Sequence, residues 1–315
     1  MQVGETLHFL GVDGGGTRCR ARLADSAGTV LGEGVAGPAN LRLGLKEAFR
    51  AVLDATGQCL VQAGLSLDDQ IFACLALAGA SEPAEAAAAQ AYGEHRFPHL
   101  LITPDAHAAC VGAHCGRDGG VVVVGTGSIG WAVHGGRQFR VGGWGFPVSD
   151  EGSGAWLGCE VVRRALRALD GRTGSTSLLK CTAEEFGSDP HAIVRWMGSA
   201  SPRDFASLAP LVVEHAARGD PSACELMRTA GTHIDALAAG LAARGVVRLA
   251  LAGGLAASIE PWLGAETRAR LVAPAADALE GALQLARGLE RARTELLGAG
   301  SRAAACGRDD KRGGT

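Results

Sequence analysis

The sequence predicts an α/β protein in which two domains of the same topology face each other across a central cleft, with a helical insertion in the second domain. At 315 residues the chain exceeds the size at which one hydrophobic core usually stops growing, which favours two domains. Near the N-terminus an apolar segment leads into a glycine-rich loop and then into alternating residues. The same pattern restarts about 111 positions later, and such a repeat is a strong indication of a duplicated architecture.

The first domain is expected over residues 1–117. It begins with the continuous apolar run of a buried strand, and two segments of period-two alternation follow, so three antiparallel strands come first. Helical spacing and further apolar runs then predict the order helix, strand, helix, strand, helix. The strands are expected at 7–12, 18–23, 28–36, 71–78 and 100–103, and the helices at 43–65, 81–92 and 106–114.

The second domain is expected over residues 118–298. Four valines behind a glycine lead into a second turn of glycines and hydroxyls, and two more strands complete a second meander. A long, almost wholly helical stretch forms the insertion before a last buried strand and a last helix. These segments are 120–124, 129–134, 138–141, 178–243, 246–252 and the helix from Asp277. Residues 299–315 are rich in Gly, Arg and Asp without periodicity, so a disordered tail is expected there.

Composition and charge exclude several classes of partner. The net charge of −3 and the near-absence of basic clusters argue against nucleic acid or an anionic membrane as the main partner. No apolar run of membrane-spanning length and no secretory leader pattern is visible, so we expect a cytoplasmic protein. The nine cysteines are scattered without a CxxC pair, which favours reduced thiols that mostly pack in the core.

Residues 11–17 carry an acid, three glycines and a hydroxyl at the end of the first strand. Glycines let backbone N–H groups approach an anion that a Cβ would hold away, so we expect this loop to bind phosphate. The expected phosphate-binding residues are Asp13, Gly14, Gly15, Gly16 and Thr17. Asp13 is also expected to bind Mg²⁺, directly or through water. A plain glycine-rich hairpin is the competing interpretation of this segment taken alone.

Two further glycine turns follow in order along the chain. Gly125, Thr126 and Gly127 form a second hairpin turn, which would hold the β- and γ-phosphates together with the first loop. Gly253 and Gly254 follow a buried strand and would leave room for adenosine, although a tight strand-to-helix turn also explains them. The three turns together resemble the nucleotide-binding pattern of the actin-like ATPase and sugar kinase superfold.

Six segments make the resemblance more specific, and they are 11–22, 39–44, 103–106, 125–128, 149–154 and 277–283. Over residues 8–290 the chain resembles the N-acetylglucosamine kinase group, and within it the bacterial glucosamine kinases, whose ATPase domain is of the BadF/BadG/BcrA/BcrD type. The resemblance implies two actin-like, ribonuclease H-like domains. It also implies transfer of the γ-phosphoryl group of ATP, with Mg²⁺, to the 6-hydroxyl of glucosamine, which gives glucosamine 6-phosphate and ADP. A homodimer is the expected assembly.

Asp105 is the residue expected to carry the chemistry. It ends a buried strand between the two repeats, where a carboxylate can accept the proton of an attacking hydroxyl. The same position suits a cap on the following helix, and the residue pattern alone leaves both roles open. The resemblance assigns the matching aspartate the role of catalytic base in contact with the sugar.

Four other residues are expected to contact the sugar. Asn40 follows a strand break, where its amide can reach sugar hydroxyls or form a turn. Asp150 and Glu151 lie among glycines before a helix, where acids can also cap the helix. By the resemblance this loop and Gly145 contact the sugar, and an acid there suits either a hydroxyl or the amine of glucosamine.

Two positions depart from the N-acetylglucosamine kinases of the animal type. Those enzymes follow the second glycine loop with an asparagine, where this chain has Ile129, and the sugar-loop asparagine with a tryptophan, where it has Leu41-Arg42. The segment Gly143-Trp144-Gly145 nevertheless matches the N-acetyl enzymes. We therefore expect a glucosamine kinase, with an N-acetylglucosamine kinase as the alternative.

Other interpretations rest on fewer observations. An iron–sulfur ATPase that activates an acyl-CoA dehydratase or reductase has similar loops, but residues 120–158 contain no cysteine to hold a cluster. A non-catalytic sugar sensor is disfavoured by the intact Asp13 and Asp105. A metal site is disfavoured because helix-face His and Cys usually pack, as would His107, Cys110, His114 and Cys115.

Three arginines alternate along the second strand. Arg18, Arg20 and Arg22 share one strand face, which we expect to be solvated. Arg18 is then the only one close enough to the loop to reach a phosphate.

Overall fold

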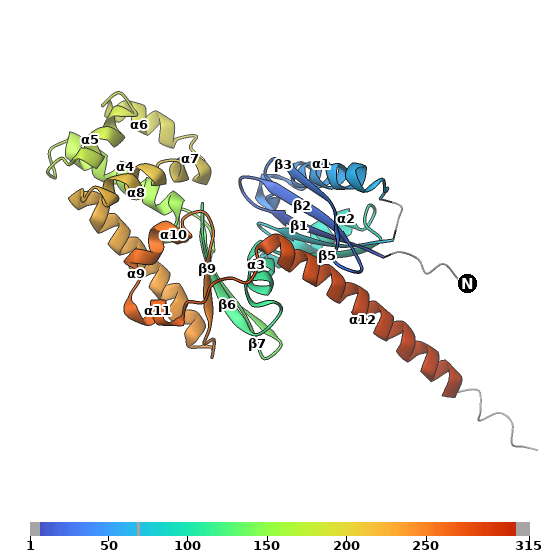
Figure 1. The fold of residues 1–315 in the computed structure, drawn as a ribbon. Coiled ribbons are helices and arrows are strands. Elements are labelled where there is room, and N and C mark those ends of the chain that lie inside the picture. The colour runs from blue at the N-terminus through green and yellow to red at the C-terminus, as the bar shows by residue number, and fades with distance from the viewer. Residues whose placement is uncertain (1–6, 68–69, 307–315) are drawn as a thin grey trace, which may run out of the picture. The chain divides into compact units, whose positions relative to one another are not determined.

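The computed structural model describes residues 7–67 and 70–306 (Figure 1). The chain forms two compact units. Unit 1 comprises residues up to Gly112 together with those from Ala278 onward, and unit 2 comprises Ala113–Asp277. The division differs from the expected one in two respects. The first boundary falls after Gly112 instead of residue 117, and the last helix belongs to unit 1 instead of the second domain.

Unit 1 contains a five-stranded mixed sheet in the order β3-β2-β1-β4-β5. The first three strands form an antiparallel meander, and β4 and β5 continue the sheet in parallel with β1. The strands are β1 His8–Gly14, β2 Cys19–Asp25, β3 Val30–Ala36, β4 Ile71–Leu77 and β5 His99–Pro104. The predicted meander, followed by strands that alternate with helices, is confirmed.

Helices cover both faces of this sheet, with α1 and α12 on opposite sides (Figure 1). Strand β4 is apolar throughout because both of its faces are buried. Leu75 packs into the core on the α1 side of the sheet, and its neighbour Cys74 packs with Leu283 of α12 on the other side. The helices of unit 1 are α1 Leu45–Ala63, after the 3₁₀ turn Leu41–Leu43, α2 Pro83–Gly93, α3 Asp105–His114, whose last two residues belong to unit 2, and α12 Ala278–Cys306.

Two glycines let α12 lie close to the rest of unit 1. A Cβ on Gly11 would stand 2.8 Å from the backbone nitrogen of Leu283, and a Cβ on Gly281 would overlap the carbonyl oxygen of Ala108 in α3. These contacts, which no sequence period reveals, explain why the last helix belongs to unit 1. Helix α12 also continues to Cys306, so residues 299–306 are helical where disorder was expected. Their alanines favour helix. The rest of the expected tail, 307–315, lies outside the described residues.

Unit 2 repeats the strand connectivity of unit 1. Its sheet has the order β8-β7-β6-β9, with β6, β7 and β8 antiparallel and β9 parallel to β6. Strands β1, β2, β3 and β4 are connected and paired in the same way. The strands of unit 2 are β6 Gly119–Val124, β7 Ser128–His134, β8 Arg137–Gly142 and β9 Leu249–Ala252. The predicted repetition of one topology is confirmed.

The helical insertion predicted in the second half is also confirmed, because helices α4 to α9 lie between β8 and β9. Proline-containing breaks start three of them, with Asp189, Ser201 and Asp220 as N-caps whose side chains accept backbone N–H bonds. The helices are α4 Gly154–Leu169, α5 Ser177–Glu184, α6 Pro190–Met197, α7 Pro202–Ala206, α8 Ala209–Ala217 and α9 Pro221–Ala242, and after β9 α10 Ala256–Ile259, the 3₁₀ turn Glu260–Trp262 and α11 Ala265–Arg270. None of the helices in the described ranges has the length and apolar character needed to cross a membrane.

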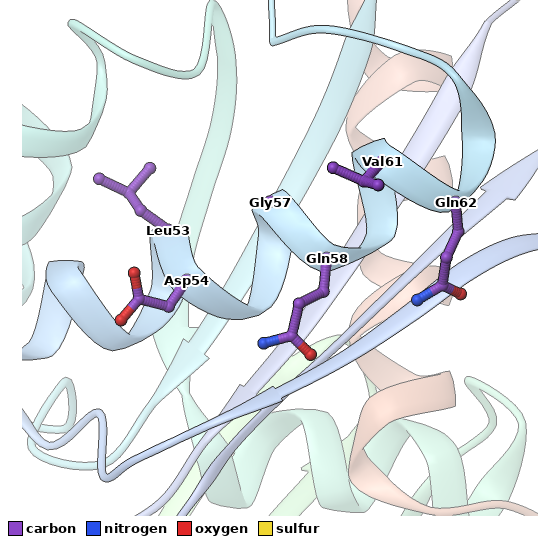
Figure 2. A pocket seen from close by; sticks show the side chains of 6 residues that line it. All are labelled: Leu53, Asp54, Gly57, Gln58, Val61 and Gln62. Atoms are coloured by element: carbon purple, nitrogen blue, oxygen red, sulfur yellow. The ribbon is translucent and has the colours of Figure 1, made fainter.

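Glutamine side chains bond the edge strands of the unit 1 sheet. Gln58 of α1 accepts a bond from the Val35 N–H at 3.1 Å and donates to the Val35 carbonyl at 2.9 Å. Gln62 makes the same two bonds with Glu33, at 3.1 and 2.6 Å. Figure 2 shows both amides directed from α1 toward the strand. At the other edge, Gln90 of α2 accepts from Ile102 N–H and donates to the Leu100 carbonyl, both at 3.1 Å. At these positions, backbone groups that an edge strand would offer to another chain are therefore occupied.

A hollow of about 510 Å³ lies along α1 beside these glutamines (Figure 2). It is lined by Leu53, Asp54, Gly57, Gln58, Val61 and Gln62. None of the residues expected to bind nucleotide or sugar lines this hollow. The candidate site is therefore built from other parts of the chain.

Candidate active site

The first glycine loop connects β1 to β2, and its glycines have different tasks. A Cβ on Gly14 would stand 2.6 Å from Leu77 Cδ2, so this glycine is needed for packing. The Gly15 N–H donates to the Arg18 carbonyl at 3.0 Å and closes the turn. Gly16 and Thr17 are exposed. Of the predicted phosphate-binding residues, these two therefore present the loop to solvent, where a ligand can reach the backbone.

Asp13 at the end of β1 forms an ion pair that the sequence pattern did not predict. Arg20 Nη2 lies 2.6 Å from Asp13 Oδ2, and Arg20 Nε donates to the same oxygen at 3.2 Å. The two residues are direct partners in the antiparallel register of β1 and β2. Arg22 is also paired, with Glu33 and with Glu280 of α12. The expectation of a solvated arginine face is therefore wrong for Arg20 and Arg22, because both find carboxylates on neighbouring elements.

Asp105 is the first residue of α3, directly after β5. Burial raises the pKa of its carboxyl to about 6, and the negative charge of Asp13 contributes to the same shift. Its Oδ1 accepts a hydrogen bond from the N–H of Ala106 at 2.9 Å. A helix cap normally bonds the second or third amide of the helix, whereas this bond goes to the adjacent residue. A carboxyl that titrates near neutral pH beside a second carboxylate is typical of a catalytic base.

Asn40 fits the turn interpretation and also lies beside the first loop. Its Oδ1 accepts a bond from the Arg42 N–H at 3.0 Å and so caps the 3₁₀ turn. Its Nδ2 lies 3.9 Å from the point where a Cβ on Gly16 would stand. The neighbouring Ala39 N–H donates to the Gly15 carbonyl at 3.0 Å and ties this segment to the loop. Unit 1 therefore brings Asn40 next to the expected phosphate-binding residues.

The second glycine loop, between β6 and β7, has a similar internal bond. The Gly125 N–H donates to the Gly127 carbonyl at 2.8 Å, and the first amides of α4 donate to the carbonyls of Gly125 and Thr126 at 2.8 and 3.1 Å. Ser128 Oγ donates to the Glu151 carbonyl at 2.7 Å. The loop is thus fixed to the N-terminus of α4.

Asp150 connects this loop to the segment expected to bind sugar. It has a positive φ of 66°, which is uncommon for a residue other than glycine. Its Oδ1 accepts a bond from the Gly145 N–H at 3.2 Å, and its Oδ2 lies 2.7 Å from the point where a Cβ on Gly127 would stand. Backbone strain of this kind often marks functional sites. Unit 2 therefore brings together Gly127, Gly145 and Asp150, while the adjacent Glu151 is exposed and accepts a bond from Ser149 Oγ at 3.3 Å.

Glycine is required by the backbone at Gly253 but not at Gly254. Gly253 has φ 97°, and a Cβ there would overlap the Val124 carbonyl of β6, so this glycine is required by the strand-to-helix turn. Gly254 is exposed, with no atom within 4 Å of its would-be Cβ. The turn interpretation therefore accounts for Gly253, and Gly254 keeps the open space expected beside an adenosine.

Replacing Gly127 with alanine is expected to weaken sugar binding with little loss of stability. The added methyl group has to displace the Asp150 carboxylate, which breaks its bond to Gly145, whereas no backbone atom obstructs it. The displaced carboxylate is expected to lose one charge-assisted bond to the sugar, which corresponds to about a tenfold rise in KM for the sugar. Steady-state kinetics and thermal melts test this. Gly174→Ala, at an exposed position with open space, is the matched control, and an unchanged sugar KM in Gly127→Ala would contradict the prediction.

The histidines and cysteines of α3 have structural partners. His107 Nδ1 bonds Thr103 Oγ1 at 2.7 Å, and His114 Nε2 bonds the Gly120 carbonyl at 2.9 Å. Cys110 is buried, with its thiol reduced. In the part of the chain that the structure describes, no three His, Cys, Asp or Glu residues cluster to hold a metal ion.

Comparison with known proteins gives a consistent picture. Residues 10–286 match the BadF/BadG/BcrA/BcrD ATPase family. The chain is 41% identical over 281 residues to the glucosamine kinase GspK of Vibrio cholerae serotype O1, an alignment that covers 89% of this chain and 95% of the relative. It is 31% identical over 175 residues to an N-acetylmuramic acid/N-acetylglucosamine kinase of Clostridium acetobutylicum, covering 54% of this chain and 57% of that protein.

Solved structures agree. A Chromobacterium violaceum protein that is provisionally described as an N-acetylglucosamine kinase superposes with a TM-score of 0.84 at 38% identity, over 90% of this chain and 99% of that chain. A ROK family glucokinase from Streptomyces griseus, solved with glucose and AMPPNP, superposes with a TM-score of 0.51 at 21% identity, over 89% and 99% of the two chains, and shares the fold. The predicted α/β fold of the actin-like kinases is confirmed. The chain belongs to the BadF/BadG/BcrA/BcrD ATPase family.

Proposed function

We propose that the protein is an ATP-dependent amino-sugar kinase that transfers the γ-phosphoryl group to the 6-hydroxyl of glucosamine, giving glucosamine 6-phosphate and ADP. The observation that carries this proposal is Asp105, a half-buried carboxyl whose pKa is raised to about 6 by burial and by the negative charge of Asp13 at the glycine loop. Phosphoryl transfer needs a base that is positioned to accept the proton of the attacking hydroxyl. It also needs hydrogen-bond donors and cations that neutralise the charge of the phosphates. Similarity to a glucosamine kinase over nearly the whole chain supports the same conclusion.

Each residue has a role in this proposal. Asp105 accepts the proton of the sugar 6-hydroxyl as that oxygen attacks the γ-phosphorus, and ADP leaves. The two glycine loops bind the phosphates through their backbone N–H groups. The nucleotide-binding residues are Asp13, Gly14, Gly15, Gly16, Thr17, Gly125, Thr126, Gly127, Gly253 and Gly254. Asn40, Asp105, Gly145, Asp150 and Glu151 bind the sugar.

Mg²⁺ fits the residues of the first loop through one carboxylate. The two bonds that Arg20 donates to Asp13 both go to Oδ2, so Oδ1 is the oxygen that would hold a water of a magnesium ion bound to the phosphates. The ion would neutralise the charge of the phosphates during transfer. Its binding by Asp13 through water accords with the small number of protein ligands that Mg²⁺ takes in phosphate-transfer sites.

The acids of the sugar loop favour glucosamine over its N-acetyl derivative. At neutral pH the amine of glucosamine is largely cationic, and Asp150 and Glu151 offer it two carboxylates, whereas an acetamido group offers no charge. N-acetylglucosamine is the second candidate, because the matched structure from Chromobacterium violaceum carries that description. The iron–sulfur activator is not supported, since residues 120–158 contain no cysteine.

A substrate panel tests the proposal. ADP release is measured with glucosamine, N-acetylglucosamine, glucose and N-acetylmannosamine, and the phosphorylated carbon is assigned by ³¹P–¹H NMR. We expect the highest kcat/KM with glucosamine and phosphate on O6. Preference for N-acetylglucosamine would replace the substrate but keep the reaction, and no turnover with any sugar would refute the kinase.

The pH profile of kcat/KM is expected to follow the Asp105 carboxyl. Only the ionised form accepts a proton, and the pKa is raised to about 6 by burial and by Asp13. The rate constant should therefore fall about tenfold per pH unit below this value and reach a plateau above pH 7. Initial rates at saturating Mg²⁺ between pH 5 and 8.5 give the profile. A profile that stays flat down to pH 5, as an aspartate with its ordinary pKa near 4 would give, would contradict the prediction.

A further inference from the structure

We propose that Arg20 is a positioning residue for phosphoryl transfer, which holds one oxygen of Asp13 so that the other is presented to the magnesium nucleotide. This inference rests on the proposed kinase function. It adds a residue on β2 to a site otherwise built from the loop, Asn40 and Asp105. Arg20 contacts Asp13 and acts through it.

The contact is fixed by the sheet and not by the loop. Asp13 and Arg20 are opposite each other in the register of β1 and β2, between the pairs Val12 with Ala21 and Gly14 with Cys19. Val12 and Cys19 are fully buried, and Ala21 and Gly14 are buried beside them. A side chain anchored on such a pair varies little in position, which is the requirement for orienting a ligand.

The geometry selects one oxygen. Arg20 Nη2 and Nε both donate to Asp13 Oδ2, at 2.6 and 3.2 Å. The side chains are 25% and 21% exposed, so the pair is partly shielded from water and its two charge-assisted bonds are stronger than those of a surface pair. With Oδ2 held, rotation of the carboxylate is restrained and Oδ1 has a defined direction.

Arg22 provides the matched comparison. It is the same residue type on the same face of β2, two positions further on, and it is equally exposed at 25%. Its partners are Glu33, which is 55% exposed, and Glu280. An arginine with a purely structural role on this strand face should therefore behave like Arg22.

The experiment compares Arg20→Gln, Arg20→Lys and Arg22→Gln in the full-length protein. Calorimetry measures binding of a non-hydrolysable ATP analogue across a Mg²⁺ titration, and kinetics give kcat and the sugar KM. Loss of a residue that orients a metal-binding group typically lowers metal affinity 10- to 100-fold. We expect Arg20→Gln to raise the half-saturating Mg²⁺ concentration by about 10-fold or more and to lower kcat, with the sugar KM unchanged. Arg20→Lys should recover part of the Mg²⁺ dependence, and Arg22→Gln should match the parent protein.

Equal Mg²⁺ dependence in Arg20→Gln and Arg22→Gln would overturn the inference. Thermal melts report folding of each variant, and if Arg20→Gln does not fold, a parent-like Mg²⁺ dependence in Arg20→Lys overturns it instead. The binding arm needs no sugar, so a protein that binds the magnesium nucleotide but phosphorylates none of the four sugars would refute the proposed function without deciding the role of Arg20.

Discussion

Replacing Asp105 with asparagine is expected to lower turnover by about 10²–10⁴, or roughly 3 to 5 kcal/mol of activation free energy, and at the same time to stabilise the fold. The asparagine keeps the shape of the side chain and its ability to accept the Ala106 bond but cannot accept the proton of the sugar hydroxyl. Turnover of the purified variant, measured with saturating ATP, Mg²⁺ and sugar, tests the first part. Near-normal turnover would remove Asp105 from the chemistry.

The stability gain follows from the pKa of Asp105. Because the folded value is raised from 3.8 to about 6, the native state holds more protons than the unfolded state between these values, and stability falls as pH rises through this window. Above pH 6 the folded protein bears the full cost of this half-buried charge, which is on the order of 1–3 kcal/mol because the residue is partly exposed. Asparagine removes this cost, so chemical denaturation should give a higher free energy of unfolding for the variant at pH 8 and equal values near pH 4.

Asp105→Ala separates the two interpretations of this residue. A pure helix cap would lose about 1 kcal/mol of stability on replacement by alanine and keep its turnover. A catalytic base would lose turnover in both variants. Loss of stability in Asp105→Asn at pH 8, together with full activity, would favour the cap.

Gly281→Ala is expected to destabilise unit 1 by about 2–3 kcal/mol, because the methyl group has no space between α12 and α3. It would overlap the Ala108 carbonyl oxygen and stand 2.6 Å from the Gly112 nitrogen, and both are backbone atoms that move only with their helix. The gain in helix propensity, about 1 kcal/mol, is too small to offset this. Since α3 begins at Asp105, turnover should also fall. Denaturant unfolding and kinetics measure both effects.

Gly288→Ala is the matched control on the same helix. Gly288 is exposed and has open space at its would-be Cβ, so alanine there should be neutral or add up to about 1 kcal/mol through helix propensity. Similar unfolding free energies for the two variants would mean that α12 does not depend on its close approach to α3.

The sequence was sufficient for the parts of the fold that follow from local periodicity. The alternation after the glycine loop predicted that β2 would follow β1 directly, and the four valines of β6 predicted the repeat. The place of α12 was not predictable in this way. Its partner surface is set by Gly11 and Gly281, where the absence of a side chain allows backbones to meet, and a missing Cβ leaves no mark in a hydrophobic pattern.

The candidate site divides in the same way. Asp105, Asn40 and the glycine loops follow strands and could be found from that position. The partner of Asp13 could not be found in this way, because it depends on the register in which β1 and β2 pair. Once that register is known, Arg20 is the residue opposite Asp13. The close approach of the Asp150 carboxylate to Gly127 depends on a left-handed backbone conformation at Asp150. No residue pattern in the sequence predicts that conformation.

The glutamines at the edges of the unit 1 sheet restrict how copies of this chain can associate. Gly32 and Gly34 of β3 have no side chain between them and α1, so the helix lies close enough for Gln58 and Gln62 to act as a substitute for a sixth strand. A homodimer that joined two sheets into one continuous sheet would first have to displace these amides. Pairing of subunits through this edge of the unit 1 sheet is therefore disfavoured. The pattern consists of two glutamines one helical turn apart on a helix, next to an edge strand with glycine at alternate positions. Protein designers can use this pattern to protect an exposed edge strand.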